Sequence, residues 1–143
     1  MILPDANVLL HAVNTSSRQH EIALEALKAC FDEVRGVGFA WVAMLAFLRI
    51  STRLGIFPRP LTTDEAFLVL GQWLGHPRAR VTHPGERHAE ILAQLLRSAG
   101  TAGNLKTDAH LAALAIEHGA TILSFDRDFA RFAGVRWTMP SDG

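Results

Sequence analysis

Short apolar segments alternate along the chain with segments in which apolar residues recur at every third or fourth position. The first pattern is typical of buried β-strands and the second of amphipathic helices. The expected strands are residues 1–3, 37–40, 79–82, 120–125 and 135–138. The first expected helix has an apolar stripe at Ala23, Leu27, Cys30, Phe31 and Val34, and the second covers residues 41–54. A third begins with a capping box at Thr62 and runs to about Leu74, and a fourth has its apolar stripe in residues 91–99. The last starts near Asp108 and is capped by Gly119.

The order of these segments indicates the fold class. Strands that alternate with helices through most of a chain are typical of a parallel sheet with helices on both faces. We therefore expect an α/β protein with three layers, in which helices flank a central parallel sheet. The 143 residues are close to the usual size of one domain, and no linker, internal repeat or low-complexity segment divides them. A single domain over residues 1–143 is expected.

Composition narrows the classes of function. Lysine and arginine together number 14, as do aspartate and glutamate, so any binding of nucleic acid must use a local basic patch. The single cysteine, Cys30, falls on an apolar helix face, where cysteine usually fills a core, and this use fits a reducing, cytoplasmic setting. The longest apolar run, residues 39–48, is well short of the roughly 18 residues that cross a bilayer, so no membrane association is expected.

Three aspartates far apart in sequence occupy positions where a parallel sheet gathers functional groups. Asp5 and Asp126 each directly follow an expected strand, and Asp108 begins an expected helix after a mobile Gly- and Asn-containing loop at residues 100–107. Because functional groups gather beyond the carboxyl ends of parallel strands, the three carboxylates are expected to converge. Taken singly, each has a plainer interpretation, as a turn residue, a favourable charge in a first helical turn, or a helix cap.

A cluster of carboxylates is unfavourable on its own, because like charges raise one another's pKa, and a bound cation removes that cost. None of the seven histidines has the paired spacing of a zinc motif, and His110 is expected to be packed or at the surface. With oxygen ligands alone, the preferred ion is Mg²⁺ or Mn²⁺. The natural substrate is then a phosphate, which water activated by the ion hydrolyses without a covalent enzyme intermediate.

Three motifs span the chain, and together they resemble those of one family. They are Leu3-Pro4-Asp5-Ala6-Asn7, Thr107-Asp108-Ala109-His110-Leu111-Ala112-Ala113-Leu114-Ala115 and Ser124-Phe125-Asp126-Arg127-Asp128-Phe129. This pattern resembles the PIN-domain ribonucleases and, more closely, the VapC toxins, over a length that extends to Trp137 and Pro140. The resemblance implies a parallel-sheet PIN fold, Mg²⁺- or Mn²⁺-dependent cleavage of RNA, frequent homodimers, and neutralisation by a cognate VapB-type antitoxin.

The resemblance also implies roles for individual residues. Asp5, Asp108 and Asp126 correspond to catalytic carboxylates of the metal site. Asn7 corresponds to a small polar residue that supports the site by hydrogen bonding. The sequence is equally compatible with Asn7 as a simple turn residue.

One position departs from the family pattern. Where such toxins carry a glutamate three residues before an arginine, this chain has Ala46 before Arg49, and no acidic residue occurs anywhere in residues 37–63. Asp128 is a candidate metal ligand in its place, directly or through water, and a solvent-facing helix residue is the alternative. A site with fewer carboxylates is expected to bind metal more weakly.

Basic side chains are candidates for contacts with RNA phosphates, because a guanidinium group binds a phosphate bidentately. The candidates are Arg49, Arg53, Arg59, Lys106 and Arg127, of which Arg49, Lys106 and Arg127 form the expected substrate-binding set. The three tryptophans stand at apolar positions and are expected in the core rather than against bases. They are Trp41, Trp73 and Trp137.

The leading hypothesis from these observations is a cytoplasmic, metal-dependent ribonuclease toxin. One alternative is a PIN-like module that binds RNA or antitoxin but turns over poorly, because Ala46 replaces the second acidic residue. Another is a phosphatase of the dehalogenase-like type with Asp5 as its nucleophile, which the asparagine at position 7 disfavours because that class expects a second aspartate there.

Overall fold

Five parallel strands form a single sheet. The computed structural model describes residues 1–55, 57–100 and 106–141. The strands are β1 (Ile2–Pro4), β2 (Val37–Ala40), β3 (Ala79–Thr82), β4 (Thr121–Leu123) and β5 (Arg136–Thr138), in the spatial order β3-β2-β1-β4-β5. Every neighbouring pair is parallel. The predicted α/β class with a central parallel sheet is confirmed, and each expected strand is present, although β4 is shorter than the predicted 120–125.

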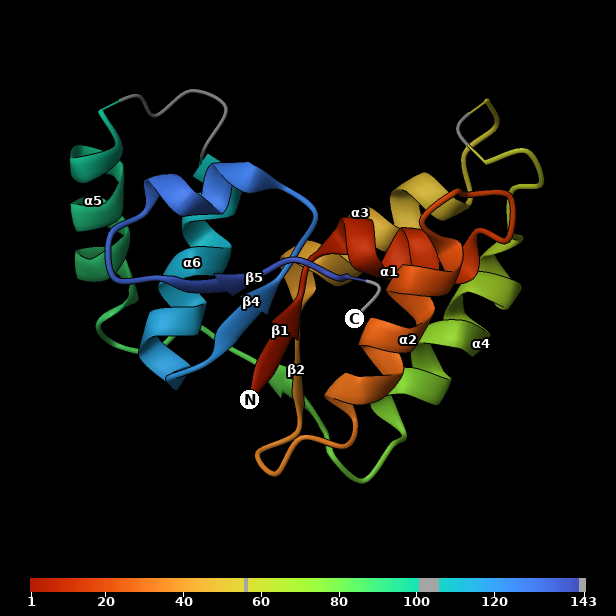
Figure 1. Cartoon of the computed structure of the whole chain (residues 1–143), viewed down its shortest axis with the longest axis horizontal. Coiled ribbons are helices and arrows are strands. Elements are labelled where there is room, and N and C mark those ends of the chain that lie inside the picture. The colour runs from red at the N-terminus through yellow and green to blue at the C-terminus, as the bar shows by residue number, and fades with distance from the viewer. Residues whose placement is uncertain (56, 101–105, 142–143) are drawn as a thin grey trace.

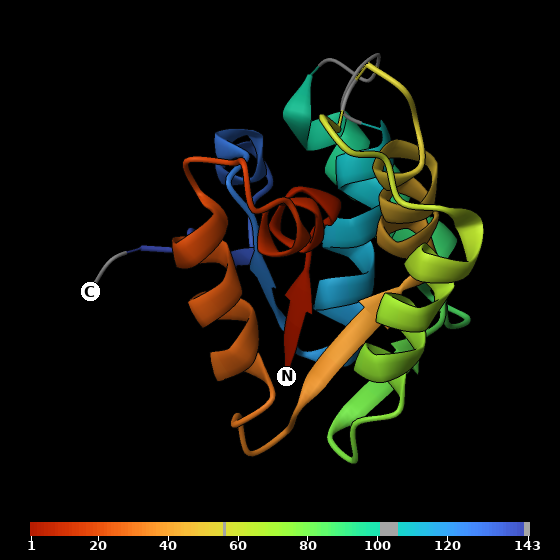
Figure 2. The same ribbon diagram turned by 90° about the vertical axis from the view of Figure 1, so that its right-hand side faces the viewer.

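Helices cover both faces of the sheet, which gives the three predicted layers (Figures 1 and 2). One face carries α5 (His88–Ala99) and α6 (Lys106–His118). The other face carries α1 (Ala6–Val13), α2 (His20–Cys30), α3 (Trp41–Ser51) and α4 (Thr63–Leu74). A short 3-10 helix, η1 (Arg127–Arg131), follows β4.

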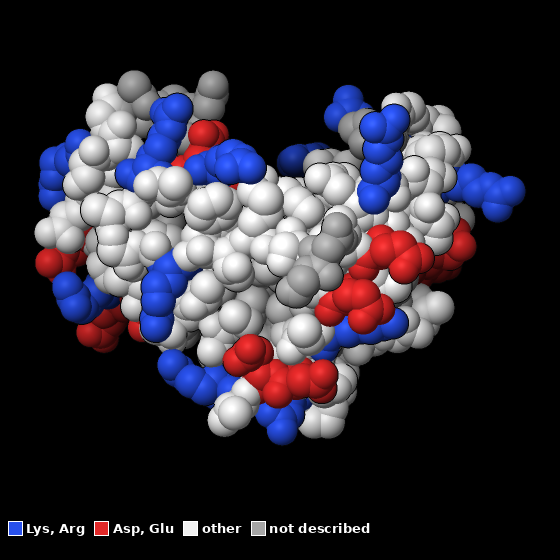
Figure 3. Space-filling view, viewed as in Figure 1, with Lys and Arg blue, Asp and Glu red and all other residues white. Residues whose placement is uncertain are grey.

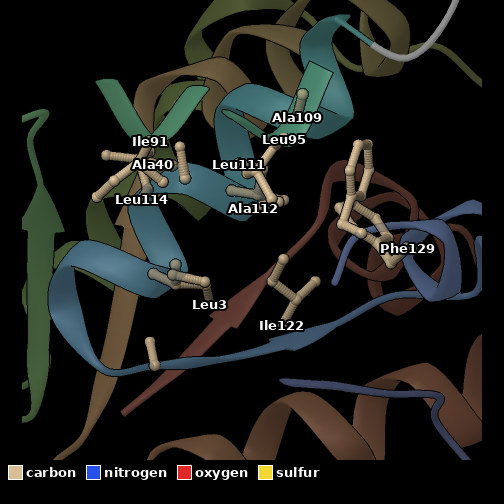
Figure 4. Close-up of a cluster of buried hydrophobic side chains, with 14 residues drawn as sticks. Leu3, Ala40, Ile91, Leu95, Ala109, Leu111, Ala112, Leu114, Ile122 and Phe129 are labelled. Carbon is tan, nitrogen blue, oxygen red and sulfur yellow. The ribbon is translucent and has the colours of Figure 1, made fainter. Parts of the chain in front are cut away.

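The core on the α5–α6 side ties the helix that carries Asp108 to the strands that precede Asp5 and Asp126 (Figure 4). Leu3 of β1 and Ile122 of β4 pack in one cluster with buried residues of α6 and with Phe129 of η1. Many of the α6 residues in this cluster are small, which lets the helix lie close to the sheet. The small residues are Ala109, Ala112, Ala113 and Ala115, and Leu111 and Leu114 belong to the same cluster.

Local signals at two helix ends are confirmed. The Thr62 hydroxyl accepts a hydrogen bond from the backbone N–H of Glu65, and the Glu65 carboxylate accepts one from the backbone N–H of Thr62, so the predicted capping box is present. Gly119 follows α6 with φ of +62°, a conformation that residues with a Cβ rarely adopt. The end of α6 at His118 is therefore set by the residue that follows it.

Helix α1 is the main element that the periodicity did not predict. It starts directly after β1, at Ala6, and its residues Val8, Leu9 and Ala12 are buried against the sheet. The helical stripe was expected only further along, to Val34, but α2 ends at Cys30 and Val34 is 92% exposed. Helix α3 also stops at Ser51, short of the predicted residue 54.

Two further expectations are resolved by the packing. Trp73 contacts Phe39 and Phe47, with ring centroids 6.1 and 5.0 Å away, as expected of a core residue. Trp41 was expected in the core, but it stands at the first position of α3 and is 43% exposed. Cys30 is buried, as predicted.

Among the described residues, no helix is both long enough and apolar enough to span a membrane.

Candidate active site

Parallel pairing of β1 with β4 brings the first and third aspartates to one edge. Pro4 and Leu123 are paired residues at the ends of the two strands. The register continues one step further, because the backbone N–H of Asp5 donates to the carbonyl of Leu123 at 2.9 Å. Asp5 then caps α1 and Asp126 caps η1, so both carboxylates lie just beyond the carboxyl ends of neighbouring strands.

A buried serine fixes the Asp5 carboxylate. The Ser124 hydroxyl donates to Asp5 Oδ2 at 2.7 Å, and the backbone N–H of Ala6 donates to Oδ1 at 2.7 Å. Burial raises the pKa of Asp5 above its usual value, with a smaller contribution from the charge of Asp126, and the two hydrogen bonds oppose this rise. Asp5 is thus a carboxylate whose orientation the protein sets.

Ser124 is a site residue that sequence reasoning did not single out. It is fully buried, and its hydroxyl oxygen also accepts hydrogen bonds from the backbone N–H of Asp126 at 3.0 Å and from Asn7 Nδ2 at 3.1 Å. One hydroxyl therefore connects Asp5, Asn7 and Asp126. The signal that could have found it is a polar residue between the apolar strand β4 and Asp126.

Asn7 links the two strand ends a second time. Its side-chain carbonyl accepts a hydrogen bond from the backbone N–H of Phe125 at 3.2 Å, and its amide donates weakly to Asp5 Oδ2 at 3.4 Å. The residue lies in the first turn of α1, so both proposed interpretations, a local turn residue and a hydrogen-bonding support, are compatible with its place in the chain.

Asp108 reaches the same edge from α6 and is the most perturbed carboxyl of the group. Its pKa is raised to about 7, chiefly by burial and then by the neighbouring charges of Asp126, Asp5 and Asp128, in that order of importance. Hydrogen bonding with Asp126 also favours the protonated form. The structure therefore brings the three predicted aspartates together, and their mutual repulsion marks a place where a cation is favourable.

Asp128 is the fourth carboxylate at this edge, and we call Asp5, Asp108, Asp126 and Asp128 together the acidic group. Its backbone N–H donates to Asp126 Oδ1 at 2.9 Å, within the first turn of η1. Carboxylate oxygens of Asp108, Asp126 and Asp128 lie within 4.8 Å of one another, an arrangement that could hold a metal ion. Asp5 is not a member of this set, although its charge acts on Asp108. Three carboxylates and no nitrogen or sulfur ligand suit a hard divalent ion.

Ala46 lines a recess of the site together with Asp5 and Asp108. A recess of about 150 Å³ lies between α1, α3 and α6. Its polar side is formed by Asp5, Thr107 and Asp108, and its other side by apolar residues, which are Ala6, Val42, Ala43, Ala46 and Leu111. Helix α3 therefore contributes only apolar residues to this recess, whereas Asp5 and Asp108 contribute its carboxylates.

The predicted phosphate-binding residues lie at different places around this edge. Arg127, on η1, is exposed, and Arg49, on α3, is exposed as well. Figure 3 shows the molecule hollowed at this edge, with basic side chains over η1 on one side and over the segment after α3 on the other. Lys106 is the first residue of α6, which corrects the predicted end of the preceding loop, but its side chain and residues 101–105 lie outside the described part of the chain.

His110 faces away from the carboxylates. Its Nδ1 lies 2.9 Å from Nε2 of His88, whose Nδ1 lies 2.9 Å from a carboxylate oxygen of Glu117. The expectation that His110 is packed is confirmed, since it lies in a hydrogen-bonded chain between α5 and α6.

Comparisons with known proteins agree on the family. The family model described as PIN domain matches residues 2–135. Ribonuclease VapC37 of Mycobacterium tuberculosis is 51% identical over 140 residues, which cover 98% of this chain and 97% of the relative. Ribonuclease VapC33 of the same species is 41% identical over 140 residues, which cover 98% of each chain.

Solved structures show the same fold at low sequence identity. A chain of VapBC2 from Rickettsia felis, in a complex bound to a promoter DNA fragment, has a TM-score of 0.71 at 16% identity and covers 99% of this chain and 100% of its own. VapC20 of Mycobacterium tuberculosis has a TM-score of 0.68 at 19% identity, covering 95% and 99%. With the sequence relatives and the family match, these results show that the chain belongs to the PIN-domain family and, within it, to the VapC ribonucleases.

Proposed function

We propose that this protein is an endoribonuclease that uses a divalent metal ion, most suitably Mg²⁺ with Mn²⁺ as a substitute, and that it is the toxin of a VapBC-type toxin–antitoxin pair. The observation that carries the proposal is the convergence of Asp108, Asp126 and Asp128 within 4.8 Å, beside Asp5, at the carboxyl edge of the sheet. The names of the relatives, ribonucleases at 51% and 41% identity, support RNA as the substrate class.

The carboxylates take different roles in this proposal. Asp108, Asp126 and Asp128 would hold the ion, and Asp5, oriented by Ser124, would add negative charge beside it. When bound, the ion supplies charge that polarises the scissile phosphate and acidifies the attacking water. Asn7 keeps the two strand ends in register. Arg49, Lys106 and Arg127 bind phosphates that flank the scissile bond.

Partners follow from the same family membership. The neighbours in solved structures include VapBC complexes, and we propose a VapB-type antitoxin and a second copy of the chain as protein partners, with the cytoplasm as the location. Exposed apolar side chains on two neighbouring helices are available for such contacts. They are Trp41 and Leu45 on α3 and Phe67 and Leu68 on α4. We further propose that residues 1–143 form one PIN domain.

The apolar wall at Ala46 favours a second candidate function. In this second candidate, the α3 side of the recess supplies no carboxylate, and the protein would be a catalytically weak module that retains binding of RNA and antitoxin. The two candidates differ in turnover and not in fold or partners. An activity assay therefore separates them.

The deciding experiment is cleavage of total cellular RNA by the purified protein in Mg²⁺, in Mn²⁺ and in chelator. Asp5→Asn/Asp108→Asn is the matched control, because it keeps side-chain size and removes two charges. Cleavage that needs the ion and is lost in the control supports the nuclease. RNA or antitoxin binding without cleavage in either ion supports the weak module.

A further inference from the structure

One arginine lies beside the acidic group, and it is not among those that the sequence pattern indicated. Arg131 Nε lies 3.7 Å from Asp128 Oδ1. Both residues belong to η1, where a 3-10 helix has three residues per turn, so side chains at i and i+3 stand on the same face. The helical period thus directs Arg131 towards the carboxylates that Asp128 joins.

The same period separates Arg131 from its neighbour Arg127. With three residues per turn, residue 127 shares a face with residue 130, whereas residue 131 shares a face with Asp128. The two arginines therefore stand on different faces of η1. Both are exposed and both belong to the same short helix. The pair therefore offers two side chains of equal chemistry and similar exposure that differ in their direction from the acidic group.

Stability does not account for the contact between Arg131 and Asp128. Their side chains are 59% and 46% exposed, and an ion pair of this kind contributes only about 0–1 kcal/mol. What the contact does is place a guanidinium group at the acidic edge. Within the described residues, Nε is the Arg131 nitrogen with an ion-pair partner, so the two terminal amino groups can take the oxygens of an anion.

The positive charge of Arg131 affects how a negatively charged substrate can enter the site. A phosphodiester that enters the site carries a negative charge towards four aspartates, namely Asp5, Asp108, Asp126 and Asp128. A cation on the η1 side lowers that repulsion and can stabilise the negative charge that grows on the phosphoryl oxygens in the transition state of phosphate hydrolysis. A guanidinium group offers two parallel donors to the non-bridging oxygens.

We propose that Arg131 is a catalytic residue that binds a non-bridging oxygen of the scissile phosphate, while Arg127 contacts a phosphate outside the reacting centre. This proposal rests on the proposed ribonuclease function and adds a substrate contact to it. Arg131 exchanges no proton and forms no covalent bond in this role. Its contribution is charge and orientation.

The test compares Arg131→Gln, Arg131→Lys and Arg127→Gln, with Arg80→Gln on the exposed edge strand β3 as control. Cleavage of total cellular RNA is followed in single turnover, which gives the rate at saturating protein and the protein concentration for half-maximal rate. We expect Arg131→Gln to lower the saturated rate by about 10²-fold, as removal of one transition-state donor does in other enzymes. We expect Arg127→Gln to raise the half-maximal concentration and to leave the saturated rate within about twofold.

Two more readouts separate substrate contact from a structural role. Binding of a fluorescein-labelled single-stranded RNA pool of random sequence is measured in the Asp5→Asn/Asp108→Asn background at several salt concentrations. Loss of one phosphate contact in Arg131→Gln should reduce the slope of log K against log salt by about 0.7. Mn²⁺ affinity of Arg131→Gln should be equal to that of the unaltered protein or tighter, since a positive charge beside Asp128 is removed.

Three results overturn the proposal. They are a saturated rate for Arg131→Gln no lower than for Arg127→Gln, an unchanged salt slope, and weakened Mn²⁺ binding, which would mean that Arg131 acts only by holding Asp128. If the unaltered protein cleaves no RNA, the proposed function fails by itself. The salt slope then decides alone whether Arg131 contacts phosphate, with an unchanged slope counting against it.

Discussion

Replacement of Asp108 by asparagine is expected to stabilise the metal-free protein at neutral and alkaline pH. Asp108 remains protonated in the folded protein up to a pKa of about 7, whereas an unfolded aspartate ionises near its ordinary 3.8. Between these values the folded state binds more protons, so the free energy of unfolding falls as pH rises through this range and stays low above it. Asparagine has similar size and no charge, and it avoids this loss.

The size of the effect follows from the pKa. A change from 3.8 to about 7 corresponds to about 4 kcal/mol at roughly 1.4 kcal/mol for each pKa unit. Asp108 is only half-buried, and screening by solvent reduces this figure, so we take about 2 kcal/mol. For a chain of this length, about 2 kcal/mol corresponds to a rise in Tm of roughly 6 °C.

Thermal unfolding followed by circular dichroism, in chelator at pH 5 and pH 8, measures this difference. Asp108→Asn should exceed the unaltered protein by roughly 6 °C in Tm at pH 8 and by less than half of that at pH 5. Asp32→Asn, at an exposed carboxyl, is the matched control and should follow the unaltered protein at both values. Parallel pH dependence of Tm in Asp108→Asn and the unaltered protein would refute the argument that repulsion and burial act on Asp108.

Three further changes test other parts of the structure. Ala46→Glu adds a carboxylate to the recess, and we expect Mn²⁺ binding measured by calorimetry to tighten about tenfold, or about 1.4 kcal/mol, while unchanged binding would place residue 46 out of reach of the ion. Ser124→Ala removes the hydroxyl that orients Asp5 and should cost about 2 kcal/mol in urea unfolding, and a loss below about 0.5 kcal/mol contradicts that role. Thr62→Ala breaks the capping box and should cost about 1 kcal/mol with RNA cleavage unaffected.

The strand ends were predictable from sequence because short apolar runs and the residues that end them carry a local signal. Asp5 and Asp126 could be assigned to one edge from that signal and from the parallel topology alone. Helix α1 was not predicted, because its segment Ala-Asn-Val-Leu-Leu-His-Ala-Val has only 8 residues, fewer than the roughly 11 over which a helical period can be recognised. Its start is set by the Asp5 cap, which had been considered mainly for its chemistry.

Side-chain direction was the part of the site that the sequence could not provide. Ser124 acts through a hydroxyl whose partners are up to 119 positions away, so no local pattern reveals it. Which of Arg127 and Arg131 points towards the acidic group depends on the three-residue turn of η1. The period of a 3-10 helix cannot be recognised in a segment of five residues. The sequence alone showed that Ala46 departs from the family pattern. Only the fold shows that this residue lines the same recess as Asp5 and Asp108.

Asp5 and Asp108 are held in the site by different means. Asp5 is oriented by Ser124 and Ala6, which are hydrogen-bond donors supplied by the protein. Asp108 has other carboxylates as its charged neighbours, and each of them raises its pKa. A cation bound at this site would therefore have its largest effect on Asp108, where it would replace a proton near neutral pH, whereas the groups that orient Asp5 belong to the protein itself. Folding alone positions Asp5, and charge compensation decides the state of Asp108.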